Sequence, residues 1–351
     1  MLIFICSIIA GVVLKFAASV ILPFTIAVLL ASALFPIIKL LDKFRVPRFI
    51  SILLIVIILV AVLSIFAMAL FSSGSNILSL YPKYETRLKE IYFNVSRLFE
   101  LPYDDSLSFW DNIWGQLGIR TWVRGFAFSF SNIFLSFLSK AFLVVLFIVF
   151  ILTEASHFRG KLEAAFENRS DRIYKMGQAV MAQITRYLTA KFFISFGTGL
   201  IFAIGLKLIG LEFAIGWGVI QFFLNFIPTL GSIAAGIAIS LFSLIQFWPN
   251  PVPVILVVSF VLVSNMVLGN FLDPKIIGEH VGISPLMILI SLGIWGFIWG
   301  FAGMVLAVPM TVIIKIICEN IPIMEPVSVL IGSPKAIMTK KAEQEKTETQ
   351  L

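Results

Sequence analysis

The chain has 351 residues, of which 60% are hydrophobic and 13% are charged, and its mean hydropathy is +1.04. Soluble proteins carry about twice this share of charged residues, so the composition excludes an ordinary soluble domain. In a membrane protein, the net charge of +7 carries topology information and does not indicate a nucleic-acid partner.

Continuous apolar stretches follow one another along the chain and predict membrane helices. One helical crossing of a bilayer needs about 20 apolar residues. The stretches do not alternate as the strands of a membrane barrel do. We therefore predict an all-α polytopic membrane protein with about eight membrane segments, two of them re-entrant helical hairpins, and a small external helical region. The stretches cover 2–22, 24–41, 49–71, 138–153, 192–211, 213–227, 232–247, 254–272 and 286–317.

The first membrane region is predicted over residues 1–71. Pro23 divides its first two apolar stretches, which predicts a tight helical hairpin there. The loop over 41–48 has three basic residues and one acidic residue, and basic residues in short loops mark the cytoplasmic side. This places the amino terminus in the cytoplasm and residues 72–137 outside.

Residues 72–137 form an extracytoplasmic amphipathic helical region in this prediction. Its apolar residues recur at helical spacing, which is typical of an amphipathic helix. We favour an external helical cap on the membrane bundle over a dedicated binding domain. The spaced residues are Tyr84, Leu88, Ile91, Val95 and Leu98.

The membrane helix at 138–153 is predicted to return the chain to the cytoplasm. Residues 154–191 follow with seven basic and four acidic residues, which predicts a cytoplasmic amphipathic helical region. The core for transport is predicted over 192–320. The tail at 321–351 is then cytoplasmic, so both termini lie on the cytoplasmic side.

Two apolar segments in this core are too short or too interrupted for ordinary crossings. The stretches 213–227 and 232–247 would each rise only about 23 Å in a helix, against about 30 Å of hydrocarbon. They predict a re-entrant hairpin over 213–247 with its tip at 225–232. Gly300 and Gly303 interrupt the segment 286–317, which predicts a second hairpin. Simple kinks at proline and glycine are the alternative.

Two interrupted hairpins that enter the membrane from opposite sides are the sequence pattern of a transporter site. Polar and turn-forming residues in them are candidates for the solute pathway, although any one amide could equally bond a neighbouring helix. Three carboxylates are candidates for ion or proton coupling, namely Asp273, Glu212 and Glu154. The pathway candidates are Gln221, Asn225, Pro228, Thr229, Gly231, Asn265, Asn270, Gly303 and Pro309.

Motifs of enzymatic chemistry are not found in this sequence. It has no P-loop, no dinucleotide glycine fingerprint, no zinc-ligand cluster and no nucleophile elbow. Cys6 and Cys318 lie far apart in apolar segments and indicate neither a disulfide framework nor a metal site. We expect no enzyme activity, no catalytic residue, no metal and no cofactor.

Three motifs in order, "FLNFIPTLGSIAAG", "GNFLDPKIIGEHVGISPLMILIS" and "GFAGMVLAVPMTVIIK", resemble the autoinducer-2 exporter family of bacterial permeases. The strong resemblance covers about 211–320. It implies a secondary transporter of the bacterial inner membrane that assembles as a homo-oligomer in the lipid bilayer. It also implies that the family's core motifs fall on Asn225, Pro228, Gly231, Asn270, Pro274, Gly278, Pro285, Gly303 and Pro309.

The resemblance implies two different transport activities. Family members are linked to export of small signalling molecules, and others are similar to cation/proton antiporters. Leu268 stands where members often have an acidic residue, and Ser284 stands where they often have histidine. The first departure weakens the case for cation coupling. We therefore expect an exporter of a small polar solute such as autoinducer-2, with a monovalent cation/proton antiporter as the alternative and a non-transporting membrane scaffold as a third class.

Overall fold

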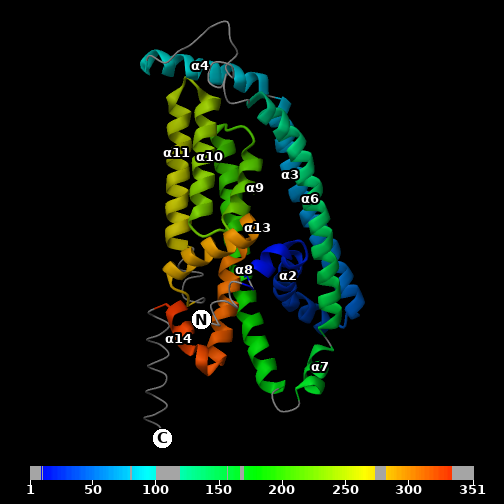
Figure 1. Ribbon diagram of the computed structural model, residues 1–351. Helices are drawn as coiled ribbons and strands as arrows, with labels where there is room; N and C mark the ends of the chain where they lie inside the picture. Colours follow the sequence, from blue (N-terminus) through cyan, green and yellow to red (C-terminus); the bar gives the residue numbers. More distant parts are fainter. Residues whose placement is uncertain are drawn as a thin grey trace. The chain divides into compact units, whose positions relative to one another are not determined.

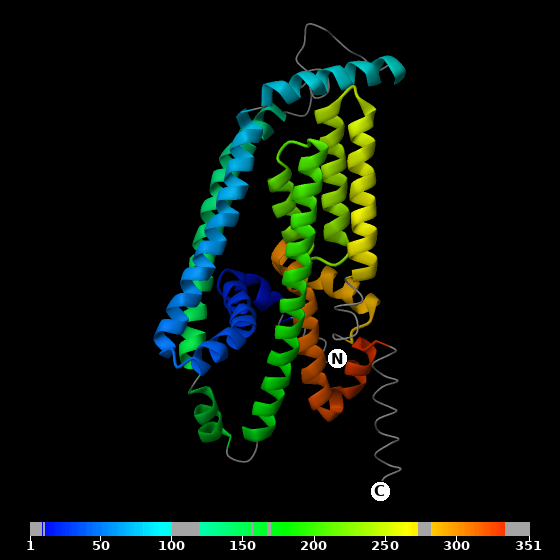
Figure 2. The same cartoon turned by 180° about the vertical axis from the view of Figure 1, so that it is seen from behind.

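The computed structural model describes residues 9, 11–79, 81–99, 119–155, 157–166, 170–272 and 282–333 (Figures 1 and 2). Its elements in these ranges are helices, and the one β-bridge described joins Ile283 and Gly332. The predicted all-α polytopic membrane protein is confirmed. The α-helices are α2 (Ala18–Lys43), α3 (Arg48–Ser79), α4 (Tyr81–Phe99), α6 (Ile119–Glu154), α7 (Phe158–Ala165), α8 (Ser170–Ile209), α9 (Ala214–Leu224), α10 (Leu230–Phe247), α11 (Pro251–Asn265), α13 (Pro285–Asn320) and α14 (Glu325–Ile331), with a π-helix η1 (Met266–Leu272) and a 3-10 helix η3 (Pro322–Met324).

Six helices in the described ranges are long and apolar enough to cross a membrane. They begin at Ala18, Arg48, Ser170, Leu230, Pro251 and Pro285. Helix α9 is apolar but has only 11 residues, about 17 Å of rise, so it is too short for a full crossing. The predicted number of about eight segments and the re-entrant character of the hairpins stay predictions.

The hairpin predicted at Pro23 is wrong. Helix α2 continues through Pro23 and Pro36, and its first residue follows a turn at Ala17. Membrane helices tolerate internal proline because neighbouring groups satisfy the backbone atoms that proline leaves unpaired. Pro23 is buried, so its ring packs inside the protein instead of ending the helix.

The chain forms two compact units. The first contains residues Met1–Leu59, Lys140–Phe193 and Asp273–Leu351, and the second contains Val60–Ser139 and Ile194–Leu272. In the first unit, α2 and the adjoining parts of α3 and α6 share an apolar core, and Arg48 Nη2 donates to the carbonyl oxygen of Leu152 at 3.4 Å. The core residues are Ala27, Ala31, Ile38, Ile52, Ile55, Val144, Ile148 and Leu152.

Helix α13 of the first unit reverses direction at Gly300. This residue has φ 63° and ψ −141°, which lies outside the helical region and suits glycine. Ser291 Oγ donates to the carbonyl oxygen of Ala307 at 3.0 Å and lies 2.5 Å from Thr311 Oγ1. Residues 16 and 20 positions apart in one straight helix would be about 24 and 30 Å apart. The two halves of α13 therefore lie side by side.

The second unit packs α9, α10 and α11 side by side (Figures 1 and 2). Its core is made by α8 from Ile194 onward together with these three helices. Asn250 caps α11 by accepting a hydrogen bond from the backbone of Val252 at 3.1 Å. The buried core residues are Phe202, Leu206, Leu211, Ala214, Ile239, Val257 and Val261.

Candidate functional site

The turn between α9 and α10 occupies residues 225–229, at the tip predicted from the sequence. The backbone N–H of Leu230 donates to the carbonyl oxygen of Pro228 at 2.6 Å, and Thr229 between them has φ 62° and ψ −57°. This is a γ-turn of the rare, strained type. A β-branched residue held in such a conformation is strained, and such strain concentrates at functional sites.

Gly231 allows α10 to begin directly against the end of α9. A Cβ atom at this position would lie 1.7 Å from the carbonyl oxygen of Leu224. The reversal in the first unit has a matching feature, because a Cβ atom on Gly303 would lie 1.9 Å from the carbonyl oxygen of Trp295. Both reversals thus require glycine shortly after the chain turns.

Helix α9 presents a narrow face of small and polar residues to α8. A Cβ atom on Gly199 would lie 2.7 Å from the carbonyl oxygen of Gly218, and one on Gly218 would lie 2.6 Å from that of Gly199. This mutual contact holds the two helix backbones close together. Gln221 and Asn225 follow Gly218 at helical spacing, so both lie near this face.

Asn225 and Gln221 are buried, but only Asn225 has a hydrogen-bond partner for its side chain. Asn225 Nδ2 donates to Ser195 Oγ on α8 at 3.1 Å, and Ser195 is fully buried. Gln221 is also fully buried, and neither its Oε1 atom nor its Nε2 atom has a partner. An unpaired buried polar atom costs about 1–3 kcal/mol, so this amide is held at the expense of stability.

Aromatic rings surround the polar end of α9. Phe66 of α3 stacks on Phe222 at 5.0 Å between ring centroids and contacts Phe223 edge-on at 5.3 Å. Phe222 in turn contacts Phe226 at 5.4 Å. Residues 213–272 have no charged side chain. The amides therefore lie in apolar surroundings, where each hydrogen bond is strengthened and each unpaired atom is costly.

The other predicted pathway residues are divided between the two units. Asn265 Nδ2 donates to the carbonyl oxygen of Ser232 at 3.2 Å and so joins α11 to the beginning of α10. Asn270 lies in η1, a π-helix of a kind that is frequent at functional sites, but its side chain lies outside the described residues. Gly303 and Pro309 belong to α13 in the first unit.

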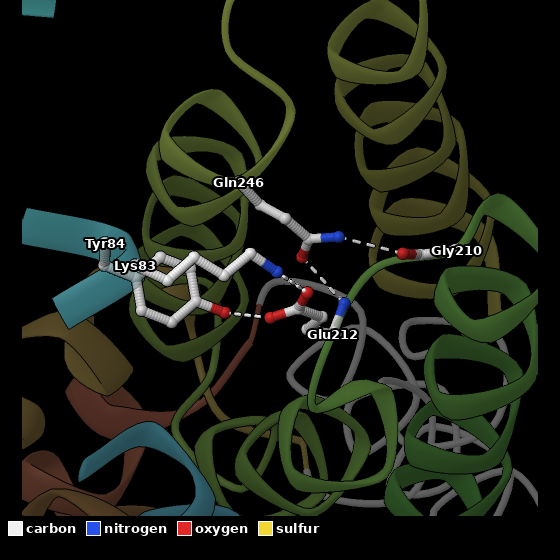
Figure 3. A network of polar contacts seen from close by, with 5 residues as sticks. All are labelled: Lys83, Tyr84, Gly210, Glu212 and Gln246. Carbon is white, nitrogen blue, oxygen red and sulfur yellow. Dashed lines mark hydrogen bonds and ion pairs between the residues drawn. The ribbon is translucent and has the colours of Figure 1, made fainter. Parts of the chain in front are cut away.

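Glu212 is engaged in a network of polar contacts that joins three elements (Figure 3). Its carboxylate accepts hydrogen bonds from Lys83 Nζ at 2.5 Å and from the Tyr84 hydroxyl group, both on α4. Gln246 at the end of α10 accepts from the Glu212 backbone N–H at 2.7 Å and donates to the Gly210 carbonyl oxygen at 2.9 Å. The network fastens helix α4 to the loop between α8 and α9.

Apolar packing and charge both support this network. The Tyr84 ring lies 5.5 Å from the ring of Phe242 and 6.4 Å from that of Phe213. Burial would raise the pKa of Glu212, but the hydrogen bonds from Lys83 and Tyr84 and the charges of Lys83 and Arg87 bring that pKa below its ordinary value. Burial and the bond to Glu212 raise the pKa of Tyr84. Glu212 is therefore held as an anion with fixed partners.

Of the two remaining coupling candidates, Glu154 is the one that lies within the described residues. Glu154 forms an ion pair with Lys161, and both side chains are more than half exposed. Asp273 lies outside the described residues. Neither Glu154 nor Glu212 has the buried, unpaired character expected of a proton carrier within a membrane.

Two buried residues on α8 were not among the sequence candidates. Ser195 precedes Gly199 by four positions, and this small-residue spacing is typical of close helix packing in membranes. Lys191 is 1% exposed and is the one charged side chain among the described residues that is buried. A buried charge in a membrane helix is a functional candidate. Lys191 is the last residue of the predicted cytoplasmic region 154–191, so the sequence gives no local signal of its burial.

Comparison with known proteins assigns the family. Residues 2–323 match the family described as "AI-2E family transporter". The chain belongs to this family. The chain is 31% identical over 324 residues to the "Putative transport protein" of Borreliella burgdorferi. The aligned region covers 92% of this chain and 87% of that relative. A protein of the same name from Haemophilus influenzae is 30% identical and covers 93% of both chains.

A third relative has a more specific name. It is the AI-2 transport protein TqsA of Escherichia coli, which is 28% identical over 320 residues and covers 91% of both chains. Family membership and the apolar helices establish a multi-pass membrane protein that functions in membrane transport. The resemblance described from the three sequence motifs is thereby confirmed.

Proposed function

We propose that this chain is a secondary transporter that exports a small polar solute across the bacterial inner membrane. The observation that carries the proposal is the pair of buried amides, Gln221 and Asn225, on a charge-free helix that ends in a strained turn. Polar side chains inside a membrane helix are costly, and they are retained where a pathway needs them. In this proposal the amides form hydrogen bonds with the solute.

Autoinducer-2 is the first solute to test, because the Escherichia coli relative carries AI-2 in its name. Metabolites exported by cells with and without the protein should be compared without preselection. We expect at least one small polar compound, with autoinducer-2 measured specifically, to accumulate outside only when the protein is present. Identical exported pools in both cultures would contradict the proposed export.

The described residues support solute transport more than cation/proton exchange. An antiporter needs a titrating group in its pathway, and Glu212 and Glu154 are both engaged in ion pairs. Sodium-driven proton movement should be measured for the wild type and for Glu212→Gln, Glu154→Gln and Asp273→Asn. We expect no sodium-dependent signal in any of them. A sodium-dependent signal in the wild type that Asp273→Asn abolishes would favour the antiporter.

The orientation and the assembly state belong to the same proposal. The basic loop at 41–48 supports a cytoplasmic amino terminus, and the basic segment at 154–191 supports a cytoplasmic position after α6. Reporter fusions at both termini should therefore report the cytoplasmic side. The mass of the protein in detergent should correspond to a homo-oligomer.

A further inference from the structure

Gln221 differs from the other interior amides of the described chain because its side chain has no partner. Asn225 bonds to Ser195, and Gln246 bonds to two backbone groups of the loop before α9. Asn265 bonds to the backbone of Ser232. Gln221 is 0% exposed, with both polar atoms unpaired.

A second unpaired donor lies one helical turn away on α9. Trp217 Nε1 is buried and has no hydrogen-bond partner. Residues four positions apart on a helix are neighbours on its surface, so Trp217 and Gln221 occupy adjoining positions on α9. The pair supplies two donor nitrogens, with three N–H groups between them, and one acceptor oxygen. Core packing accounts for the Trp217 ring, which contacts Phe242 at 5.5 Å between ring centroids. It does not account for the unpaired N–H of Trp217 or for the Gln221 amide, because unpaired buried atoms destabilise the folded chain.

Helices α9, α10 and α11 bear on the charge of a group that fits there, while the buried Lys191 of α8 belongs to the first unit. The 60 residues of 213–272 have no charged side chain, so nothing on α9, α10 or α11 neutralises an ion beside Gln221. Transfer of an unpaired ion into apolar surroundings costs far more than transfer of an uncharged polar group. An amide also offers a donor next to an acceptor, which matches a hydroxyl or carboxamide group.

We propose that Gln221, assisted by Trp217, is the residue that selects the transported solute, and that it accepts an uncharged hydroxyl or carboxamide group. This inference rests on the proposed function, because it specifies the chemistry of the same solute. Gln221 is closed off from solvent, and the backbones of Gly199 and Gly218 are in close contact beside it. The packing that buries Gln221 therefore has to open before a solute reaches the amide.

In this proposal, removal of the Gln221 amide raises the stability of the protein and lowers its transport rate. Methionine is unbranched and similar in length to glutamine, but it has no donor and only a weak acceptor. The Gln221→Met variant of the full chain should therefore unfold at a temperature higher by roughly 2–4 °C. The same variant should lose transport. Asn94→Ala is the matched control, because Asn94 is exposed on α4 and bonds to its own helix.

The transport experiment uses proteoliposomes and four small probes. Glycerol and acetamide are uncharged, and acetate and methylammonium carry one charge. We expect the wild type and Asn94→Ala to pass the uncharged probes, and Gln221→Met to pass them at least about tenfold more slowly, the factor that corresponds to one lost hydrogen bond. Trp217→Phe, which keeps a ring but removes the N–H donor, should reduce the same flux by a smaller factor.

Four outcomes would count against the inference. A Gln221→Met variant that unfolds at a lower temperature than the wild type would show that water or protein satisfies the amide. Unchanged flux of the uncharged probes in Gln221→Met would show that the amide does not select the solute, while solute transport itself would stand. Faster passage of acetate or methylammonium than of glycerol and acetamide would contradict the claim that the selected group is uncharged. Solute transport itself would again stand. A wild type that passes none of the four probes and exports no metabolite would overturn the proposed function as well.

Discussion

Asn225 donates a hydrogen bond from its Nδ2 atom to the Oγ atom of Ser195 at 3.1 Å, and both side chains are buried. The bond joins the carboxyl-terminal end of α9 to α8, where the chain is about to enter the strained turn at Thr229. One polar contact thus fixes the position at which the apolar hairpin is interrupted.

Loss of the Ser195 hydroxyl group should destabilise the chain by about 1–3 kcal/mol, because Asn225 Nδ2 would remain buried without a partner. The double variant Ser195→Ala with Asn225→Leu should recover most of this loss, since it removes both polar partners. Thermal unfolding in detergent measures the difference, and Ser72→Ala at an exposed position is the control. Equal stability of Ser195→Ala and wild type would contradict the buried bond.

Gly231 should not tolerate even a methyl group. In Gly231→Ala the added Cβ would approach the Leu224 carbonyl oxygen to 1.7 Å, so the backbone has to shift, at an expected loss of about 3 kcal/mol or more. Gly293→Ala is the matched control, because no atom lies within 4 Å of its added Cβ. The control should be neutral or stabilising by up to about 1 kcal/mol. Equal unfolding temperatures for the two variants would refute the tight turn.

The Glu212 network should make the stability of the folded chain depend on pH. Because the folded-state pKa of Glu212 lies below its ordinary value of 4.5, its contribution is present above pH 4.5 and is lost as the pH falls through the lowered pKa. Lys83 and Glu212 are 41% and 29% exposed, which limits the ion pair to about 1 kcal/mol or less. Glu212→Gln should therefore lower the unfolding temperature at neutral pH and should match the wild type well below pH 4.5.

Glu90→Gln provides the control for this pH profile, because Glu90 is an exposed carboxylate on α4, the helix that carries Lys83. Its unfolding temperature should follow the wild type throughout. A difference between Glu212→Gln and wild type that persists unchanged in acid would mean that the effect is not electrostatic.

Local sequence patterns predicted the amphipathic helix α4 and the turn between α9 and α10. The spacing of Tyr84, Leu88 and Ile91 predicted the amphipathic helix α4, in which Tyr84 is buried and the other two are half-buried. Proline and glycine between short apolar runs predicted the turn at 225–232. These features depend on residues close together in sequence, so periodicity and turn chemistry reveal them.

Contacts between distant residues were not predictable in the same way. The ion pair between Lys83 and Glu212 joins residues that lie 129 positions apart. The mutual approach of Gly199 and Gly218 depends on how α8 and α9 pack, since neither glycine is in an unusual local pattern. The prediction at Pro23 failed because a local helix-breaking signal was outweighed by packing inside the protein.

Solute efflux from proteoliposomes that contain Asn225→Ala is the most direct test of the account, with Asn94→Ala as the control. The vesicles should be loaded with autoinducer-2 or with the compound found by the comparison of exported metabolites. If the interior amides of α9 bind the solute, Asn225→Ala should lower the efflux rate by about tenfold or more while Asn94→Ala retains the wild-type rate. Equal efflux by all three proteins, at equal amounts of folded protein, would contradict the assignment of the solute pathway to this helix.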